Sequence, residues 1–399
     1  MNLVCRKGME FHSVQGSDRL NKRTFLAIGV VLCLIGIVIY KQAGGPIATP
    51  EVRTSPVKPD GKIKGMQPEQ QEVYDFIKAR MKGPFGVYTN YQDTEQSREV
   101  ATGHEVLSES ASLLMRVYAH SQDQPSFDQE WTTAKQTFDL KHGFSYRYSP
   151  KLDKRYPLNA AVDDLRIIRA LYEAGEAFGD VSYTKEADQY GQRFYATNVK
   201  DNLLYDFYDE TYNITNPFIT LCYIDLRTLG QLPIESRQKQ KLLNGMKAVI
   251  HNGYLSDSFP FYETRFQYNT NSYTSEKIQT VESLLTILHL AEAGETKPAS
   301  IAYIKEHVQA GTLYGQYSKE GKPATDVQST AIYAITAMIG AEIGDASLYQ
   351  DSIRRMNAYQ VKNPGSPLYG GFGDTSANQA YSFDNLMALL AYTYDSERR

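Results

Sequence analysis

Apolar residues over most of the chain recur with the 3.6-residue period of an amphipathic helix, and the strict alternation typical of strands is scarce. Gly- and Pro-containing turn signals separate the periodic segments. The pattern predicts twelve helices, which we place at 68–81, 104–121, 126–140, 160–179, 183–198, 216–230, 234–251, 275–293, 298–311, 326–343, 346–360 and 381–395.

A weak internal repeat organises these helices. Segments 171–190, 290–308 and 340–356 each read as a helix end, a Gly, a short turn and a new helix. Such an echo indicates stacked helical hairpins. Twelve helices in six hairpins predict an all-α domain, an (α/α)6 toroid whose inner helices are apolar nearly all round. Segments 281–291 and 331–341 have that composition, and so does 219–229.

Four irregular segments are expected to form loops at the rim of the toroid. They hold many aromatic residues, including Tyr146 and Tyr262. A Tyr ring offers a flat apolar face with a polar tip, which suits contact with a sugar. The same ring also packs loops onto a barrel, and the sequence leaves both interpretations open. The four segments are 84–98, 142–158, 254–274 and 363–380.

An uncharged apolar run at 24–40 precedes the helical part. Its 17 residues would form about 25 Å of helix, at the short end of what spans a bilayer. Basic residues are denser before the run than after it, which predicts a cytoplasmic segment 1–23, a transmembrane anchor 24–40, a flexible Gly- and Pro-rich linker 41–67 and an extracellular domain 68–399. A cleaved signal peptide is the alternative, but the cleavage signal is weak. We therefore expect a single-pass protein of the cell membrane.

Composition and motifs exclude several functions. The net charge of −4 and the lack of a basic stripe argue against nucleic-acid binding. The chain has no GxxxxGK[ST] or GxGxxG loop, no GxSxG elbow and no closely spaced His pair, so we expect neither a nucleotide cofactor nor a metal. Carboxylates at predicted helix starts remain, and glycoside hydrolysis needs two of them facing one cleft.

Glu109 is the first candidate. It lies one turn beyond Glu105, whose spacing from Thr102 fits a capping box. Its neighbours Leu107 and Leu113 predict an apolar setting, and such a setting favours the protonated carboxyl that a general acid needs. The alternative is a solvent-facing Glu on an ordinary helix.

Two further predicted helix starts carry acids. Asp163 and Asp164 are adjacent, so their side chains point about 100° apart and cannot both reach one ligand atom. Glu276 is expected in the first turn of the helix predicted at 275–293. For all three, compensation of the helix dipole is the alternative explanation. Glu282 lies deeper in that last helix, and an acid there also needs a reason.

At these places the chain resembles glycoside hydrolase family 8. Ser108-Glu109-Ser110-x-x-Leu113-Leu114-Met115 resembles the motif that holds the family's catalytic acid, Ser-Glu-Gly-x-x-Tyr-Gly-Met. Residues 160–175, AAVDDLRIIRALYEAG, resemble a second motif of the family. That motif is Ala-Ser-Asp-Ala-Asp followed by a helix ending in Leu-Leu-Glu-Ala-Gly. Ser275-Glu276-Lys277-Ile278-Gln279 occupies the place of a third, Tyr-Asp-Ala-x-Arg, which holds the base.

The resemblance implies an (α/α)6 barrel, covering residues 68–395, that cleaves β-linked polymers with inversion. It makes Glu109 the general acid and Glu276 the base, and gives contact with a central sugar to Asp163 or Asp164. The family's first Asp of the second motif falls on Val162, and Glu276 and Gln279 replace Asp and Arg. These departures are typical of a divergent branch of membrane-anchored hydrolases encoded with exopolysaccharide synthases.

The leading prediction is an endo-acting, inverting, extracytoplasmic glycosidase that trims an exopolysaccharide, with synthase components as partners and Tyr146 and Tyr262 among the sugar contacts. The rival is a non-catalytic polysaccharide-binding subunit of a synthesis or export system. A third reading is a polysaccharide lyase, which would use a Tyr and Arg cluster such as Tyr262 and Arg265.

Overall fold

The structure, a computed structural model, describes residues 66–97 and 100–394. The predicted cytoplasmic segment, the anchor at 24–40 and nearly all of the linker lie outside the described residues. Contacts divide the chain into two units, of which the second, Met9–Lys62, lies wholly outside them. Within the described part, no helix is long and apolar enough to cross a membrane. The anchor therefore stays a prediction.

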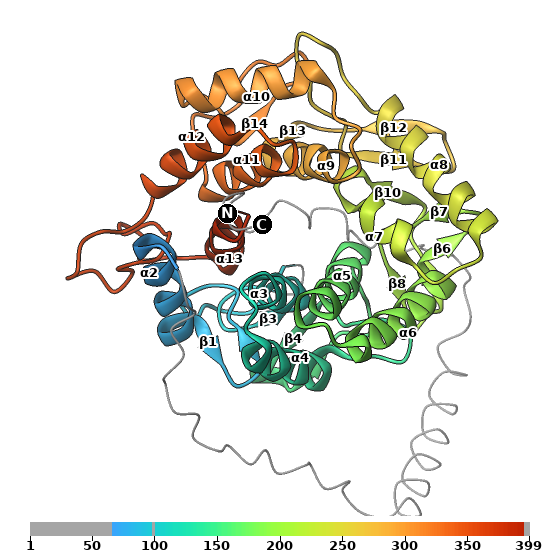
Figure 1. Cartoon of the computed structure of the whole chain (residues 1–399), viewed down its shortest axis with the longest axis horizontal. Helices are drawn as coiled ribbons and strands as arrows, with labels where there is room; N and C mark the ends of the chain where they lie inside the picture. Colours follow the sequence, from blue (N-terminus) through green and yellow to red (C-terminus); the bar gives the residue numbers. More distant parts are fainter. Residues whose placement is uncertain (1–65, 98–99, 395–399) are drawn as a thin grey trace, which may run out of the picture. The chain divides into compact units, whose positions relative to one another are not determined.

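The twelve α-helices of the described residues alternate along the chain between an outer and an inner ring (Figure 1). The outer helices are α2 (Pro68–Phe76), α4 (Gln124–Phe138), α6 (Val181–Asn198), α8 (Ser236–Asn252), α10 (Pro298–Ala310) and α12 (Ala346–Asn357). The inner helices are α3 (Ser108–His120), α5 (Ala161–Phe178), α7 (Leu226–Gln231), α9 (Thr280–Glu292), α11 (Thr330–Glu342) and α13 (Ser382–Tyr392).

Burial explains this alternation. In α11 every residue from Thr330 to Gly340 is buried, whereas α10 buries only Ser300, Ile304 and Val308. A helix that is apolar all round needs neighbours on every side, and one with a single apolar stripe covers it from outside. The inner ring closes because α3 packs on α5 and α13, α11 packs on α9 and α13, and α7 lies between α5 and α9. The predicted toroid of helical hairpins is confirmed.

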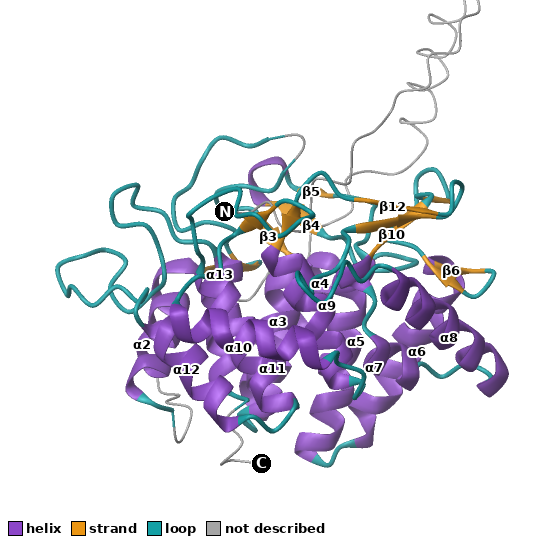
Figure 2. Cartoon of the chain, turned by 90° about the horizontal axis from the view of Figure 1, so that it is seen from above, coloured by secondary structure: helices purple, strands orange, loops and turns teal. Residues whose placement is uncertain are grey.

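Short strands gather at one end of the helical ring (Figure 2). Each has two or three residues, too few to give an alternating pattern in the sequence. They form small antiparallel sheets. The sheets β3–β4–β5 and β10–β11–β12 have three strands, and the others have two. The strands are β1 (Lys82–Gly83), β2 (Gly86–Val87), β3 (Val106–Leu107), β4 (Arg147–Ser149), β5 (Lys154–Arg155), β6 (Val199–Lys200), β7 (Leu203–Leu204), β8 (Tyr208–Asp209), β9 (Ile214–Thr215), β10 (Phe218–Thr220), β11 (Arg265–Gln267), β12 (Ser272–Thr274), β13 (Ile278–Gln279) and β14 (Gln316–Tyr317).

These strands correct three predicted helix boundaries. The segment 216–230 is not one helix: β10 and the 3-10 turn Leu221–Tyr223 precede the short α7. The reason is tertiary, because Ile219 in β10 pairs with Phe266 in β11. Similarly, α3 and α9 begin four and five residues later than predicted, because β3 and β13 run directly into them.

The predicted capping box becomes part of the rim instead of a helix start. The Thr102 amide does donate to Glu105 Oε2 at 2.9 Å, but in the turn before β3. Arg147 in β4 grips the same carboxylate through Nε at 2.8 Å and Nη2 at 2.7 Å. The two side chains are 0% and 1% exposed. A buried bidentate pair of this kind is costly to break from one side.

We predict that Glu105→Gln lowers the free energy of unfolding by about 3 kcal/mol, because it leaves the buried Arg147 charge uncompensated. Urea unfolding of the full-length protein, followed by the fluorescence of the single Trp131, measures this loss. Lys151→Gln is the control, since it removes a solvent-exposed pair with Asp93 and should cost less than about 1 kcal/mol. Equal small losses in both variants would contradict the prediction.

Candidate active site

Acidic side chains mark the first turns of four inner helices. Glu109 opens α3, Asp163 opens α5, Glu282 opens α9 and Asp384 opens α13. A negative charge there is stabilised by the unpaired N–H groups and the positive end of the helix dipole. Strands β3 and β13 run directly into α3 and α9, and hydrogen bonds join the start of α3 to the first turns of α5 and α13. The strands gather at one end of the ring (Figure 2), so these four residues share that end. We call them the acidic rim.

Glu109 lies in a charged setting, not in the apolar one that the sequence predicted. Arg166 Nη1 is 3.7 Å from Glu109 Oε2 and 3.1 Å from Asp163 Oδ1. Ser108 Oγ donates to Asp163 Oδ2 at 3.4 Å. One guanidinium therefore links the acids of two neighbouring helices. The Glu109 side chain keeps 13% exposure, which leaves room for a ligand to reach the carboxyl.

Asp164, in contrast, faces into the protein. It is 1% exposed and accepts hydrogen bonds from the Phe144 amide at 3.2 Å and from Asn159 Nδ2 at 2.8 Å. Burial raises the pKa of Asp164 to about 8, against the lowering effect of the Asn159 hydrogen bond. Its carboxyl fastens the rim loop that contains Phe144 and Asn159. The sugar contact predicted for Asp163 or Asp164 therefore does not fit Asp164, and for Asp163, which is 4% exposed, it stays a prediction.

Glu276 does not lie in a helix. It follows β12 and precedes β13, four residues before α9 begins at Thr280, and it is exposed. Its predicted place in a first turn is wrong, because the chain first pairs as β13 with β14. Its predicted role as the base stays a prediction.

The two predicted aromatic contacts are covered. The Tyr146 ring is 6% exposed and lies 5.9 Å from Tyr156. Tyr262 is 1% exposed and lies 5.4 Å from Tyr254, so neither face of its ring is open to a sugar. The bland interpretation, in which these aromatics pack the rim loops, describes both residues. Burial of Tyr262 also removes support for a lyase that would use it with Arg265.

Glu282 of the acidic rim has a buried acidic neighbour, Asp206, that the sequence did not predict. Glu282 is 8% exposed, and its Oε2 atom has no hydrogen-bond partner among the described residues. Burial raises the pKa of Glu282 to about 8, with Arg265 opposing the rise and Asp206 adding to it. Burial likewise raises the pKa of Asp206 to about 6, against hydrogen bonds from Thr220. The signal in the sequence was an acid inside the apolar run 281–291.

This pair adjoins the first turn of α5. The Ala161 amide donates to the Asp206 carbonyl at 2.7 Å, and Ala161 lies two residues before Asp163. Two carboxyls whose pKa values are raised by burial, Glu282 and Asp206, thus lie at the same end of the ring as Glu109 and Asp163. Raised carboxyl pKa values of this kind are typical of sites that use acid–base catalysis.

Another set of side chains has the donor types of a metal site. Ligand atoms of Asp225, His289 and Glu292 lie within 4.8 Å of one another. However, Arg169 Nη1 lies 2.7 Å from Glu292 Oε1 and 3.7 Å from Asp225 Oδ2. The guanidinium already supplies the positive charge that these carboxylates require, so the donor set does not fit a metal ion.

No family model matches the sequence. YdaJ, a candidate lipoprotein of Bacillus subtilis (strain 168), is 27% identical over 293 residues, which cover 71% of this chain and 78% of YdaJ. A solved structure described as a novel α-amylase from Clostridium perfringens is 33% identical, with a TM-score of 0.76, and the match covers 82% of this chain and 97% of the other.

A second solved structure identifies the fold type. Endoglucanase Cel10 from Klebsiella pneumoniae, a family 8 glycosyl hydrolase, matches with a TM-score of 0.57 and 15% identity over 82% of this chain and 99% of its own. This chain is a glycoside hydrolase with the fold of family 8. The resemblance proposed from the motifs at Glu109 and at residues 160–175 is therefore confirmed, while the roles of single residues stay predictions.

We predict that Glu282 makes the hydrolase less stable as the pH rises. Its folded pKa of about 8 lies above the ordinary value of a Glu, so between pH about 4.5 and 8 the folded state holds a proton that the unfolded state has lost. Stability from this group is complete below that window and falls through it. In Glu282→Gln the difference in unfolding free energy between pH 5 and pH 8 should shrink by on the order of 2 kcal/mol.

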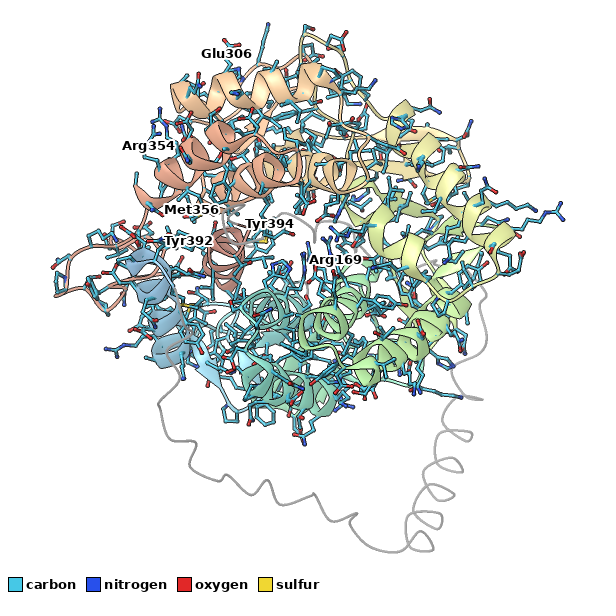
Figure 3. The ribbon with its side chains drawn as sticks, viewed as in Figure 1. Arg169, Glu306, Arg354, Met356, Tyr392 and Tyr394 are labelled. Carbon is cyan, nitrogen blue, oxygen red and sulfur yellow. The ribbon has the colours of Figure 1, made fainter. Side chains whose placement is uncertain are left out.

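Urea unfolding at the two pH values measures that difference. Glu306→Gln, a change on the exposed face of α10 (Figure 3), is the control. Its stability should depend on pH as that of the parent protein does. An unchanged pH dependence in Glu282→Gln would refute the prediction.

Proposed function

We propose that the protein is an endo-acting glycosidase that hydrolyses a polysaccharide outside the cell with inversion. The observation that carries the proposal is the acidic rim, in which acids on adjacent inner helices share one end of the toroid. Substrate chains bind across such a mouth more easily than through the ring, whose axis is filled by packed side chains. The predicted anchor at 24–40 would hold this domain at the cell membrane, close to exopolysaccharide synthase components.

In the proposed reaction Glu109 protonates the leaving glycosidic oxygen. A base on the opposite face of the sugar removes a proton from the attacking water, and the predicted base is Glu276. The water oxygen forms a bond to the anomeric carbon as the bond to the leaving oxygen breaks. Asp163 and Arg166 contribute by position: Arg166 contacts both acids, and Asp163 accepts a hydrogen bond from a sugar hydroxyl.

Two linkages compete for the substrate. The motif resemblance implies a β-linked exopolysaccharide. The relative from Clostridium perfringens is described as an α-amylase, which supports an α-linked glucan as a second candidate. The rival without catalysis remains a polysaccharide-binding subunit, and the exposed position of Glu276 is the observation that favours it.

We predict that Glu109→Gln lowers kcat at least about 100-fold, because it removes the general acid and keeps the shape of the side chain. Reducing-end release by the full-length protein in mild detergent, from amylose, β-glucans and bacterial exopolysaccharides, measures the loss and identifies the linkage. Glu306→Gln, on the outer ring, should match the parent. Undiminished activity of Glu109→Gln would show that another residue is the general acid. A parent protein that binds one polymer but hydrolyses none would favour the polysaccharide-binding subunit.

We also predict that the first product has the anomeric configuration opposite to that of the substrate bond, and that Glu276→Gln slows its release at least about 100-fold. Proton NMR during the first minutes of hydrolysis follows both. Glu320→Gln, which changes an exposed Glu in another rim turn, is the matched control. Retained configuration would exclude the inverting mechanism, and full activity of Glu276→Gln would assign the base to another residue.

A further inference from the structure

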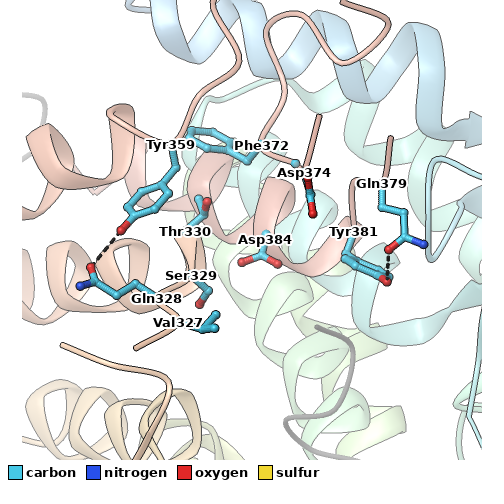
Figure 4. Close-up of a pocket in the computed structure, with 11 residues that line it drawn as sticks. Val327, Gln328, Ser329, Thr330, Tyr359, Phe372, Asp374, Gln379, Tyr381 and Asp384 are labelled. Carbon is cyan, nitrogen blue, oxygen red and sulfur yellow. Dashed lines mark hydrogen bonds between the residues drawn. The ribbon is translucent and has the colours of Figure 1, made fainter. Parts of the chain in front are cut away.

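A pocket of about 380 Å³ opens at the rim between the first turns of α11 and α13 (Figure 4). Its walls come from the segment before α11, the residue Tyr359 beyond α12, and the loop that leads into α13. The volume lies at the small end of the range for ligand sites, and suits one sugar ring better than several. The lining residues that matter here are Gln328, Tyr359, Asp374, Tyr381 and Asp384.

The pocket adjoins the proposed catalytic acid. Ser110 Oγ donates to Ser382 Oγ at 3.0 Å, a buried hydrogen bond that joins the first turns of α3 and α13. Glu109 comes directly before Ser110, and Asp384 comes two residues after Ser382. A sugar in the pocket would therefore lie on the helix next to the one that carries Glu109.

One wall is a rigid aromatic surface. Tyr359 is 40% exposed, its hydroxyl donates to Gln328 Oε1 at 2.9 Å, and its ring stacks on Tyr333 at 6.0 Å. Gln328 is itself fixed, because Oε1 also accepts from the Tyr333 hydroxyl at 2.6 Å and Nε2 donates to the Gly311 carbonyl at 2.7 Å. A ring held in this way binds an apolar sugar face with little loss of side-chain entropy.

Two carboxyl groups, those of Asp374 and Asp384, are among the polar groups of the pocket. Hydrogen bonds from Ser376 and Ala377 lower the pKa of Asp374, whereas burial raises the pKa of Asp384. Asp384 Oδ1 accepts the Ala331 amide at 3.0 Å, and Figure 4 shows this carboxyl between Thr330 and Tyr381. Asp374 is held by its own turn, where Oδ1 accepts the Ser376 amide at 2.8 Å. No Lys or Arg is among the lining residues. Carboxylates accept hydrogen bonds from sugar hydroxyls, and they repel a sugar that carries a carboxylate of its own.

We propose that this pocket binds one residue of the polysaccharide beside the bond cleaved at Glu109, and that it selects sugars without a carboxylate and rejects uronic acids. The inference rests on the proposed glycosidase function. Tyr359 supports a face of the sugar ring, and Asp384 accepts hydrogen bonds from its hydroxyls. Neither role involves the catalytic acid, so binding and hydrolysis can be tested separately.

Binding is measured by calorimetry on the full-length protein in mild detergent. The parent for this test carries Glu109→Gln, because that substitution prevents turnover. The probes are maltohexaose, cellohexaose and the oligoglucuronate obtained by C6 oxidation of cellohexaose. The parent should bind at least one neutral hexamer and bind the oligoglucuronate at least tenfold more weakly than cellohexaose or not at all. Asp384→Asn keeps the acceptor for the Ala331 amide, and Tyr359→Ala removes the ring. Each should weaken binding of the neutral hexamer at least tenfold.

Tyr369→Ala is the matched control, since Tyr369 has the same 40% exposure and lies outside the pocket lining; its affinity should equal that of the parent. Three results would each overturn the proposal. Both pocket variants could bind the neutral hexamer with the affinity of the parent, the parent could bind the oligoglucuronate as tightly as cellohexaose, or it could bind neither neutral hexamer. Hydrolysis by the wild-type chain with an unaffected Kd in Asp384→Asn would refute the pocket alone. Pocket-dependent binding without hydrolysis would support the pocket and refute the glycosidase.

Discussion

Buried ion pairs at the axis of the toroid hold its inner ring together. Glu173 on α5 accepts hydrogen bonds from Arg116 on α3 at 2.8 and 2.9 Å and from Arg169, one turn away, at 2.9 Å. Arg169 reaches Glu292 on α9 at 2.7 Å, and Arg116 reaches the Tyr394 hydroxyl just beyond α13 at 2.8 Å. Figure 3 shows Arg169 and Tyr394 pointing into the centre of the ring. Burial alone would raise the pKa of Glu173, but Arg116, His120 and Arg169 hold it well below its ordinary value. Because unpaired charge is so costly inside a protein, any other arrangement of α3, α5 and α9 that breaks one of these contacts is penalised.

The same network separates the structural end of the ring from the chemical end. Its members His120 and Glu292 lie in the last turns of α3 and α9, whereas the acidic rim lies in the first turns. The axis keeps a void of about 20 Å³, which is room for about one water molecule. A polysaccharide cannot pass through such a core. Substrate must therefore bind across the rim, where helix dipoles favour carboxylates and where short strands and loops shape the surface.

The inner helices could be predicted from sequence because their apolar character is continuous. Segment 331–341 has no charged residue, and apolar residues outnumber polar ones in segment 281–291, so an enclosed position fits both. Segment 219–229 is also rich in apolar residues, but the prediction of one continuous helix there was wrong. Its first residues pair with β11, a partner some 45 residues later that no local pattern reveals. Site residues failed for a related reason. Burial of Tyr262 depends on Tyr254 and α9, and the charged setting of Glu109 depends on Arg166, none of which follows from local spacing.

Asp163 and Asp164 show how far spacing alone can reach. Helix geometry required that the two carboxyls diverge, and they do: one joins Ser108 and Arg166 at the mouth, and the other holds Phe144 and Asn159 beneath the rim. Which acid took which place depended on the loop that folds over α5. The two roles also support each other, because the loop held by Asp164 includes β4, which pairs with β3, the strand that ends two residues before Glu109. A buried acid with a raised pKa thus positions the strand that aims the candidate catalytic acid, although it touches no substrate itself.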